Sequence, residues 1–507
     1  MCFNDSLVRR SLSFALLAAL IVPVAAGTAD PGDWTLPNLS RVSTRAPEGS
    51  PISARTVGHL RVLWRFRFLH SAVQYPVSAP ESLRGVVATP IVAGNTVYIQ
   101  DATSAVYAID RTNGALRWVH PLDAPNFGRN GLSYSSGSVY GSTDTTVFAL
   151  SAASGQMLWQ RRLVTPTEQY IDIAPLIANN LVYVSTVGYP PGGDGAIYAL
   201  NAHDGHVRWR FSTIRGGWRH PDEAGGGGAW YTPSVDAYGN IYSGVANPYP
   251  TGGTPRQPNG GAFPGAALYT DSLIYLNGRT GKLLWFDQVT PHDIRDYDFQ
   301  LPPILASIPS GSSKKPVIIA AGKAGIVIAW NQVTHRRIWQ TLVGRHLNAT
   351  GPLPAHTVRI CPGFYGGVET PMAYADARVF VPVVDLCTHG SADGYQAVGS
   401  LNPIDGTGEF AALDATDGGL LWSRALPQPD FGCATVATGV VFTSTFDGHI
   451  YAFSTRNGAT LWQTRASAGI NGCPALSGDM LLVAAGSATT KMPDPKYELI
   501  AYALHSG

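Results

Sequence analysis

An eleven-residue phrase that ends in tryptophan recurs seven times along this chain. The copies run from AIDRTNGALRW (108–118) to AFSTRNGATLW (452–462), and their last residues are Trp118, Trp159, Trp209, Trp285, Trp339, Trp422 and Trp462. A counterpart near the start, LRVLWRF (60–66), contains Trp64, and the chain ends in ELIAYAL (498–504), half a phrase with no tryptophan after it. Together the two fragments make one complete unit, so the sequence predicts a ring closed by its N-terminal strand.

Each unit has the pattern of four short antiparallel strands. In the first unit these are the runs 88–94, 95–101, 105–110 and 115–120. Asn-Gly, Ser-Gly, Asp-Gly and Thr-Gly pairs between the last two strands of successive units are typical of tight hairpins. Four such strands cannot bury both faces alone, so the units must stack on one another. We therefore predict an all-β fold, an eight-bladed β-propeller with the tryptophans docked between blades.

The last blade is expected to take three strands from residues 472–504 and its outer strand from 60–66. Two intervals between docking tryptophans, Trp209 to Trp285 and Trp339 to Trp422, are much longer than the others. Their additional residues should form long loops on one face, where function usually resides. The formal net charge is only +1, with 14% charged residues, which argues against a nucleic-acid partner.

The first 26 residues resemble a secretory signal. Arg9 and Arg10 precede an apolar stretch (12–26) that ends in small residues suited to cleavage. A retained membrane anchor is the alternative, but the stretch is short for a span. We expect a periplasmic or secreted protein with no membrane span after signal removal. The expected organisation is a signal peptide (1–26), an extended segment (27–57) and a single propeller domain (58–507).

Four cysteines remain after signal removal, an even number in an oxidising compartment. Three pairings are possible, and we prefer Cys361–Cys387 and Cys433–Cys473. The second pair occupies matching positions in consecutive repeats, FGCATVATG and NGCPALSGD. Free buried thiols are the alternative, and no spacing fits a zinc site or a CxxCH haem attachment site.

The tryptophan phrases resemble the docking motifs of the pyrroloquinoline quinone (PQQ) dehydrogenases, the quinoprotein alcohol dehydrogenases, over about residues 55–505. The segment TPHDIRDYDFQLPPIL (290–305) is similar to the family's TPHDxWDYD stretch, with Arg295 in place of tryptophan. The resemblance implies that Asp296 is the catalytic base and also a metal ligand, and that Asp298 is the additional acid of lanthanide-type members. The alternative is that these aspartates, with Asp293, are turn residues of a solvated loop.

A second segment, GGGGAWYTPSVDAYGNIYSGVANPYP (225–250), is similar to the family's GGGxxW…GxGNPxPW stretch. The match places Trp230 under the PQQ ring system and makes the Asn247 amide a metal ligand. Lys323 matches a cation that contacts the quinone oxygens, and Arg129 resembles an arginine that pairs with a PQQ carboxylate. Ordinary core, turn and surface roles are the alternatives for these four residues.

Three positions depart from the family pattern. No two cysteines are adjacent, although many members have an adjacent-cysteine disulfide over PQQ. The metal-binding glutamate of the family would fall at Pro190, with Asp194 in the same loop as a substitute shifted in register. Val87 stands where many relatives have an acidic PQQ contact. The pattern thus indicates a quinoprotein site with parts missing.

The resemblance implies an exported PQQ-dependent alcohol dehydrogenase that uses PQQ with Ca²⁺ or a lanthanide ion. The expected partners are a small-molecule or polymeric alcohol, as for polyvinyl-alcohol dehydrogenases, and a soluble cytochrome c or similar electron acceptor. A non-catalytic binding or scaffold propeller is the alternative, supported by the three departures. A quinoprotein glucose dehydrogenase is a third possibility, which the PHDxxDYD-type segment fits less well.

Overall fold

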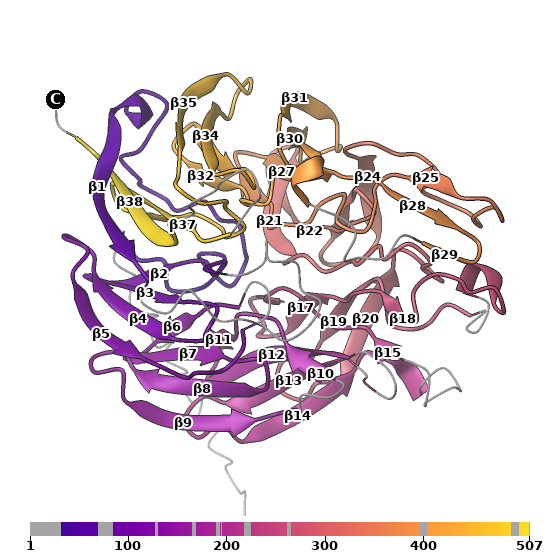
Figure 1. Ribbon diagram of the computed structural model, residues 1–507, viewed down its shortest axis with the longest axis horizontal. Helices are drawn as coiled ribbons and strands as arrows, with labels where there is room; N and C mark the ends of the chain where they lie inside the picture. The colour runs from indigo at the N-terminus through magenta and orange to yellow at the C-terminus, as the bar shows by residue number, and fades with distance from the viewer. Residues whose placement is uncertain are drawn as a thin grey trace, which may run out of the picture.

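Eight antiparallel sheets, seven of four strands and one of five, form a ring in this computed structural model, which describes residues 32–68, 85–126, 130–164, 169–188, 193, 195–216, 225–260, 265–395, 403–487 and 496–505. Figure 1 shows the sheets arranged around a central axis, with the colour running round the ring to the C-terminus beside β1. The predicted all-β, eight-bladed propeller is confirmed. The signal segment (1–26) lies outside the described residues.

In each blade the strands run outward from the ring axis, so the first strand named is the innermost. Blade 1 is β2 (Ile91–Ala93), β3 (Thr96–Gln100), β4 (Val106–Asp110) and β5 (Leu116–His120). Blade 2 is β6 (Ser133–Ser135), β7 (Ser138–Ser142), β8 (Thr146–Ser151) and β9 (Met157–Arg162). Blade 3 is β11 (Leu176–Ala178), β12 (Leu181–Gly188), β13 (Ala196–Asn201) and β14 (Val207–Ser212), with β10 (Gln169–Ile171) also paired to β12. Blade 4 is β16 (Ser234–Val235), β17 (Ile241–Gly244), β19 (Ser272–Leu276) and β20 (Leu283–Gln288).

The second half of the ring repeats the arrangement. Blade 5 is β21 (Ile304–Ser310), β22 (Ser313–Ala321), β23 (Ile326–Asn331) and β24 (Arg337–Leu342). Blade 6 is β26 (Ala373–Ala375), β27 (Arg378–Asp385), β30 (Thr407–Asp414) and β31 (Leu420–Leu426). Blade 7 is β32 (Thr435–Ala437), β33 (Val440–Ser444), β34 (His449–Ser454) and β35 (Thr460–Arg465). Blade 8 is β36 (Ala475–Ser477), β37 (Met480–Ala485), β38 (Glu498–Leu504) and β1 (Leu60–Arg67).

Blade 8 closes the ring as predicted, because its outer strand comes from the N-terminal part of the chain. β1 pairs antiparallel with β38, from Leu60 opposite Leu504 to Arg67 opposite Glu498. This pairing gives blade 8 its fourth strand, and it covers the edge of β38 that would otherwise be exposed.

Most docking tryptophans cover a glycine of the next blade. The Trp118 indole Nε1 donates to the carbonyl of Ala152 at 3.0 Å, and a Cβ added to Gly155 would meet the indole at 2.6 Å. Gly155 has a φ of +70°, a conformation that glycine adopts without strain. The same contact joins Trp64 to Gly114, Trp159 to Gly205, Trp209 to Gly281, Trp339 to Gly418 and Trp422 to Gly458. The glycine of the repeated phrase is therefore required by packing as well as by the turn.

The segment before β1 lines the innermost strands of the propeller. Its backbone pairs with one innermost strand after another, beginning with Trp34 and Val92 at 2.8 and 2.9 Å and ending with Val436 N–H, which donates to Arg45 at 2.9 Å. Inner strands present unpaired N–H groups, and this segment satisfies several of them. The other bonds of this kind run from Tyr134 to Thr35, Val235 to Arg41, Leu305 to Val42 and Tyr374 to Thr44.

Arg45 fixes this segment at the axis. Its side chain is fully buried and donates to the carbonyls of Pro37, Ala434 and Pro474 at 2.7–3.0 Å, as well as to Asn38 and Thr435. Burial lowers the pKa of Arg45 to about 9, which leaves the guanidinium charged at neutral pH. The guanidinium joins blades 7 and 8 to the N-terminal segment, because it bonds to residues of all three.

The two long intervals form insertions that contact each other. The first carries β15 (Gly225–Gly226), β18 (Pro248–Tyr249) and the turn η4 (Pro258–Gly260), and the second carries β25 (Val358–Ile360), β28 (Thr388–Ser391), β29 (Gly394–Tyr395) and η6 (Pro403–Asp405). Asn259 N–H donates to Ala392 at 2.6 Å, and its side chain donates to Leu353 at 3.2 Å. The remaining turn, η1 (Val57–His59), precedes β1.

Both preferred disulfides are confirmed. Cys361–Cys387 joins two parts of the second insertion, and Cys433–Cys473 joins the segments that lead into blades 7 and 8. No helix in the described part of the chain is both long enough and apolar enough to span a membrane.

Candidate active site

The acidic loop between β20 and β21 has a defined turn. Both carboxylate oxygens of Asp293 accept backbone N–H groups, from Arg295 at 2.8 Å and from Tyr297 at 2.6 Å. Asp296, between these two residues, has a φ of 67°, which a short polar side chain tolerates better than most. Asp293 thus stabilises the turn through its side chain, and Asp296 lies within that turn.

Lys323 joins the two other aspartates of the loop. Its Nζ lies 2.7 Å from Asp296 Oδ2 and 2.6 Å from Asp298 Oδ2. Lys323 follows the end of β22, and its backbone N–H donates to the Asp298 carbonyl at 3.0 Å, so the two segments are also joined through the backbone. All three side chains are buried. The solvated loop considered from the sequence is therefore not what the structure contains.

Asn247 completes this cluster. Its backbone N–H donates to Asp298 Oδ1 at 2.8 Å. Its side-chain Nδ2 donates to the carbonyl of Pro248 at 3.0 Å and to Thr251 Oγ1 at 2.5 Å. With both amide hydrogens engaged, the side-chain Oδ1 accepts no hydrogen bond from the described residues and stays available to a cation.

Burial governs the protonation of the acids. It raises the pKa of Asp296 to about 8, against the opposing charge of Lys323, and raises the pKa of Asp293 to about 6. Burial alone would lower the pKa of Lys323, but the charges of Asp296 and Asp298 outweigh it and hold this pKa well above the usual value. Asp296 is thus a carboxylate with raised proton affinity beside a permanent cation, as general-base chemistry requires.

The sequence reasoning missed two further acids, Asp271 and Glu369. Asp271 is fully buried just before β19, and neither carboxylate oxygen has a hydrogen-bond partner among the described residues. Burial, followed by the charges of Asp293, Asp298 and Asp296, raises its pKa well above the usual value. Its signal in the sequence was an acid at the head of an apolar strand, LYTDSLIYL.

Glu369 connects the acidic cluster to the tryptophan segment. Its Oε2 accepts a hydrogen bond from Gln300 Nε2 at 3.2 Å, and its backbone carbonyl accepts one from the Tyr231 hydroxyl at 2.8 Å. Its charge also acts on Lys323. Tyr231 follows Trp230 directly, so the predicted cofactor floor and the predicted base belong to one connected region.

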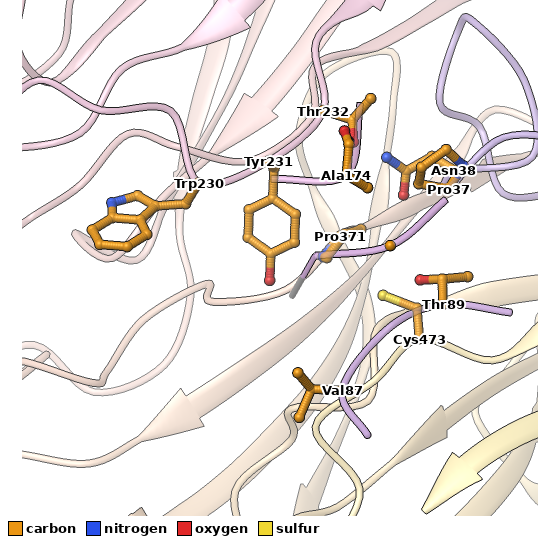
Figure 2. A pocket seen from close by; sticks show the side chains of 11 residues that line it. Pro37, Asn38, Val87, Thr89, Ala174, Trp230, Tyr231, Thr232, Pro371 and Cys473 are labelled. Carbon is orange, nitrogen blue, oxygen red and sulfur yellow. The ribbon is translucent and has the colours of Figure 1, made fainter. Parts of the chain in front are cut away.

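Trp230 borders a small cavity that is lined by residues from several blades and from the N-terminal segment. Figure 2 shows Trp230 at one end of the cavity and Val87 and Cys473 on other parts of its wall. The indole Nε1 of Trp230 is buried without a partner among the described residues, and its ring lies 6.1 Å from that of Tyr170. The full lining is Pro37, Asn38, Val87, Thr89, Gly131, Ala174, Trp230, Tyr231, Thr232, Pro371 and Cys473.

Arg295 anchors the acidic loop to the second insertion. Its guanidinium donates to the carbonyls of Asn348, Thr350 and Gly351 at 2.9, 3.2 and 2.6 Å. These hydrogen bonds explain what an arginine does at a position where the family commonly has tryptophan. The predicted Arg129, Pro190 and Asp194 lie outside the described residues.

The second insertion also reaches the ammonium group of the cluster. The Phe364 ring centroid lies 5.0 Å from Lys323 Nζ, within cation–π range. Phe364 is three residues from Cys361, whose disulfide to Cys387 joins this part of the insertion to β28. The disulfide thus supports a loop that borders the cluster.

The donor set suits a hard cation if Lys323 moves. Among the described residues, no three Asp, Glu, His or Cys side chains form a ready-made ion site, and Lys323 Nζ stands between Asp296 and Asp298. The oxygens of these two carboxylates and of Asn247 are the ligand type that Ca²⁺ and lanthanides prefer. An ion would therefore enter by displacing the ammonium from at least one carboxylate.

Several buried polar atoms near the cluster have no hydrogen-bond partner among the described residues. Besides Trp230 Nε1, the unpartnered atoms include Gln300 Oε1 and Thr370 Oγ1. Such atoms are rare in folded proteins and usually meet a ligand or water. The residues present therefore include the aromatic face and the hydrogen-bonding atoms that a polar, planar group requires, although the cavity beside Trp230 is not lined by Lys323 or by the aspartates.

Comparison with known proteins identifies the family. The family described as glucose/ethanol/alcohol dehydrogenase, beta-propeller domain, of the PQQ type, matches residues 34–342, and the family of the outer membrane protein assembly factor BamB matches residues 382–507. The chain belongs to the PQQ-type dehydrogenase family and is a quinoprotein alcohol dehydrogenase-like oxidoreductase. The resemblance stated from the docking motifs is confirmed.

Individual relatives cover most of the chain. A quinohemoprotein alcohol dehydrogenase of Comamonas testosteroni is 26% identical over 89% of this chain and 72% of its own length. A lanthanide-dependent methanol dehydrogenase of Methylacidiphilum fumariolicum is 24% identical over 88% of this chain and 82% of its own. The crystal structure of the Comamonas testosteroni quinohemoprotein superimposes with a TM-score of 0.80, at 22% identity, over 95% of this chain and 82% of that one, which shows the shared fold.

Proposed function

We propose that this protein is an exported PQQ-dependent alcohol dehydrogenase in which Asp296 takes the hydroxyl proton of the substrate. The observation that carries the proposal is the buried arrangement of Asp296, Lys323 and Asp298, with Lys323 Nζ within 2.7 Å of both carboxylates. Burying three charged side chains costs stability, so the fold alone does not explain this cluster of Asp296, Lys323 and Asp298. Its presence in a dehydrogenase fold supports a catalytic role.

Each predicted residue has a part in holding the cofactors. Trp230 would stack against PQQ, Lys323 would face its quinone oxygens and Arg129 would pair with one of its carboxylates. Asn247, Asp296 and Asp298 would hold Ca²⁺ or a lanthanide ion through oxygen atoms. When bound, PQQ accepts the two electrons that leave the alcohol as a hydride, and the ion polarises its carbonyl.

The chain itself supplies the proton chemistry. Asp296, with a pKa raised by burial to about 8, accepts the hydroxyl proton at a carboxylate oxygen. Lys323 keeps its charge and can stabilise negative charge on an acceptor oxygen once it leaves Asp298. Asp293 keeps the loop in place through its two backbone hydrogen bonds.

Export and the electron acceptor complete the proposal. The signal-like residues 1–26 and two disulfides support an oxidising compartment, periplasmic or extracellular. Electrons would pass to an external acceptor such as a soluble cytochrome c, as the name of a relative from Thauera butanivorans, 1-butanol dehydrogenase (cytochrome c), suggests for that enzyme. Small-molecule and polymeric alcohols are the substrates to be tested.

Reconstitution tests the proposal directly. Purified protein is mixed with PQQ and either Ca²⁺ or La³⁺, and quinone absorbance and dye-linked alcohol oxidation are measured. We expect cofactor uptake and turnover, and Asp296→Asn should lower kcat at least about 1,000-fold while sparing uptake. Asp430→Asn, at another buried aspartate, is the matched control and should retain turnover.

A non-catalytic binding or scaffold propeller is the second candidate. The match of residues 382–507 to the assembly-factor family and the departures at Pro190 and Val87 favour it. That candidate gains support if neither ion brings about PQQ uptake. Uptake with full turnover in Asp296→Asn would remove Asp296 from its role while keeping the enzyme.

A further inference from the structure

Phe364 lies at the tip of a tight turn in the second insertion. The Gly366 N–H donates to the Gly363 carbonyl at 2.9 Å, which closes a four-residue turn with Phe364 and Tyr365 at its centre. The turn is tied to the segment that follows β27, because the Gly363 N–H donates to the Leu386 carbonyl at 2.8 Å. These two hydrogen bonds fix the backbone that carries the Phe364 ring.

The same turn packs against the loop of the proposed base. Tyr297, which follows Asp296, donates a hydrogen bond from its hydroxyl to the Pro362 carbonyl at 3.2 Å. On the other side of the turn, Gly367 lies directly on the backbone of Lys323, where an added Cβ would meet the Lys323 carbonyl at 2.0 Å. The turn is therefore held in one position relative to Asp296 and Lys323.

The Phe364 ring borders the buried ion pair of the site. Its centroid lies 5.0 Å from Lys323 Nζ, and Nζ lies 2.7 Å from Asp296 Oδ2. Only 9% of each of the two charged side chains is exposed, whereas Phe364 is half-buried. An alcohol that approaches the pair from solvent on this side therefore meets the phenyl ring before it reaches the carboxylate.

We propose that Phe364 determines substrate specificity by favouring alcohols with an apolar carbon chain over polyhydric alcohols. The inference rests on the proposed function, because it concerns the substrate of the same base. A methyl or methylene group gains from burial against a phenyl ring. A second hydroxyl at this place would lose its hydrogen bonds to water, and the ring offers no hydrogen bond in return.

The contact with Lys323 strengthens this selection. The ring occupies one side of the ammonium at cation–π distance, so an additional substrate hydroxyl cannot bind Nζ from that side. The carboxylates of Asp296 and Asp298 already occupy two other directions around Nζ. Phe364 thus removes the polar contact that a polyhydric alcohol would otherwise make there.

Two primary alcohols with the same three-carbon chain, 1-propanol and glycerol, test the proposal. The kcat/KM of each is measured in wild type and Phe364→Ala after reconstitution with PQQ and the ion that supports turnover. We expect wild type to prefer 1-propanol, and Phe364→Ala to lower the ratio of the two values at least about 10-fold. A variant that merely loosens the loop lowers both values alike and leaves the ratio unchanged.

Three further variants make the test specific. Phe364→Leu keeps an apolar side chain and should hold the ratio within about 3-fold of wild type. Phe364→Gln puts a polar amide in place of the ring and should lower the ratio as alanine does, so it serves equally if Phe364→Ala does not fold. Phe211→Ala, at a half-buried ring of β14 that packs on a different apolar cluster, is the matched control and should leave the ratio unchanged.

The outcomes separate this proposal from the proposed function. Quinone absorbance first establishes equal PQQ uptake in all of the proteins. A ratio that stays unchanged in Phe364→Ala and Phe364→Gln would overturn the proposal and leave the alcohol dehydrogenase intact, as would wild type that prefers glycerol. Wild type that oxidises neither alcohol would overturn both.

Discussion

The indole of Trp285 stacks on the imidazole of His335, with ring centroids 4.6 Å apart and planes 14° from parallel. At this junction between blades 4 and 5, histidine replaces the glycine found in the other copies of the phrase. His335 still has a φ of 55°, and its Nε2 lies 3.0 Å from the Tyr242 hydroxyl. Trp285 therefore still docks on the next blade, but its partner there is a titratable side chain.

This histidine should make one junction sensitive to acid. Burial lowers the pKa of His335, so the folded state binds the proton less tightly than the unfolded state. Its contribution to stability is present above the unfolded value, about 6.5, and is lost as pH falls below that value. His335→Gly should lose less in Tm than wild type between pH 7.5 and 5.5. Equal losses in the two proteins would contradict this.

The glycines under the tryptophans can be tested one at a time. Gly155→Ala should lower the free energy of unfolding by about 2 kcal/mol or more, from left-handed strain and a clash with Trp118. Gly137→Ala is the matched control, because Gly137 has a φ of +79° with open space around it, and it should cost only about 1 kcal/mol. Denaturant unfolding of both variants measures the difference in the free energy of unfolding. Equal losses would show that the contact with Trp118 does not explain the cost at Gly155.

Arg295 should affect turnover only by holding the loop that carries Asp296 in position. Arg295→Leu removes the hydrogen bonds to Asn348, Thr350 and Gly351 and should cost about 1–3 kcal/mol of stability. We also expect kcat for alcohol oxidation to fall, because the loop that carries Asp296 loses its anchor. Arg337→Leu, at a more exposed ion pair with Asp287, is the control and should change stability by less than about 1 kcal/mol. Unchanged kcat in Arg295→Leu would assign Arg295 to stability only.

The pH dependence of turnover should follow Asp296. Burial raises the pKa of Asp296, so the protonated and inactive form becomes more populated as pH falls, and kcat/KM should rise as the pH rises through this raised pKa. A bound cation stabilises the carboxylate, so this limb should lie at lower pH with La³⁺ than with Ca²⁺. Rate profiles with each ion test this, and a rate that falls between pH 6 and pH 8 would contradict the assignment of Asp296 as base.

The sequence predicted the ring well because its signals are local and repeated. Each docking phrase carries its own turn and its own tryptophan, and the two half-phrases at 60–66 and 498–504 specified closure. The motif 290–305 likewise identified Asp296 and Asp298. What the sequence does not predict is the pairing of side chains from different blades. Lys323 was named from its motif, but its ion pairs with Asp296 and Asp298 are non-local, and Asp271 and Glu369 were missed. His335 stands in the repeat where glycine was expected, and only packing explains it.

The closure of blade 8 sets an order of events for the chain. β1 leaves the ribosome first but pairs with β38, whose last residue is Leu504, so the earliest strand must wait for almost the whole chain to be made. Arg45 likewise waits for Ala434 and Pro474. The ring therefore closes only once β38 has been synthesised, so blade 8 is the last blade that can form.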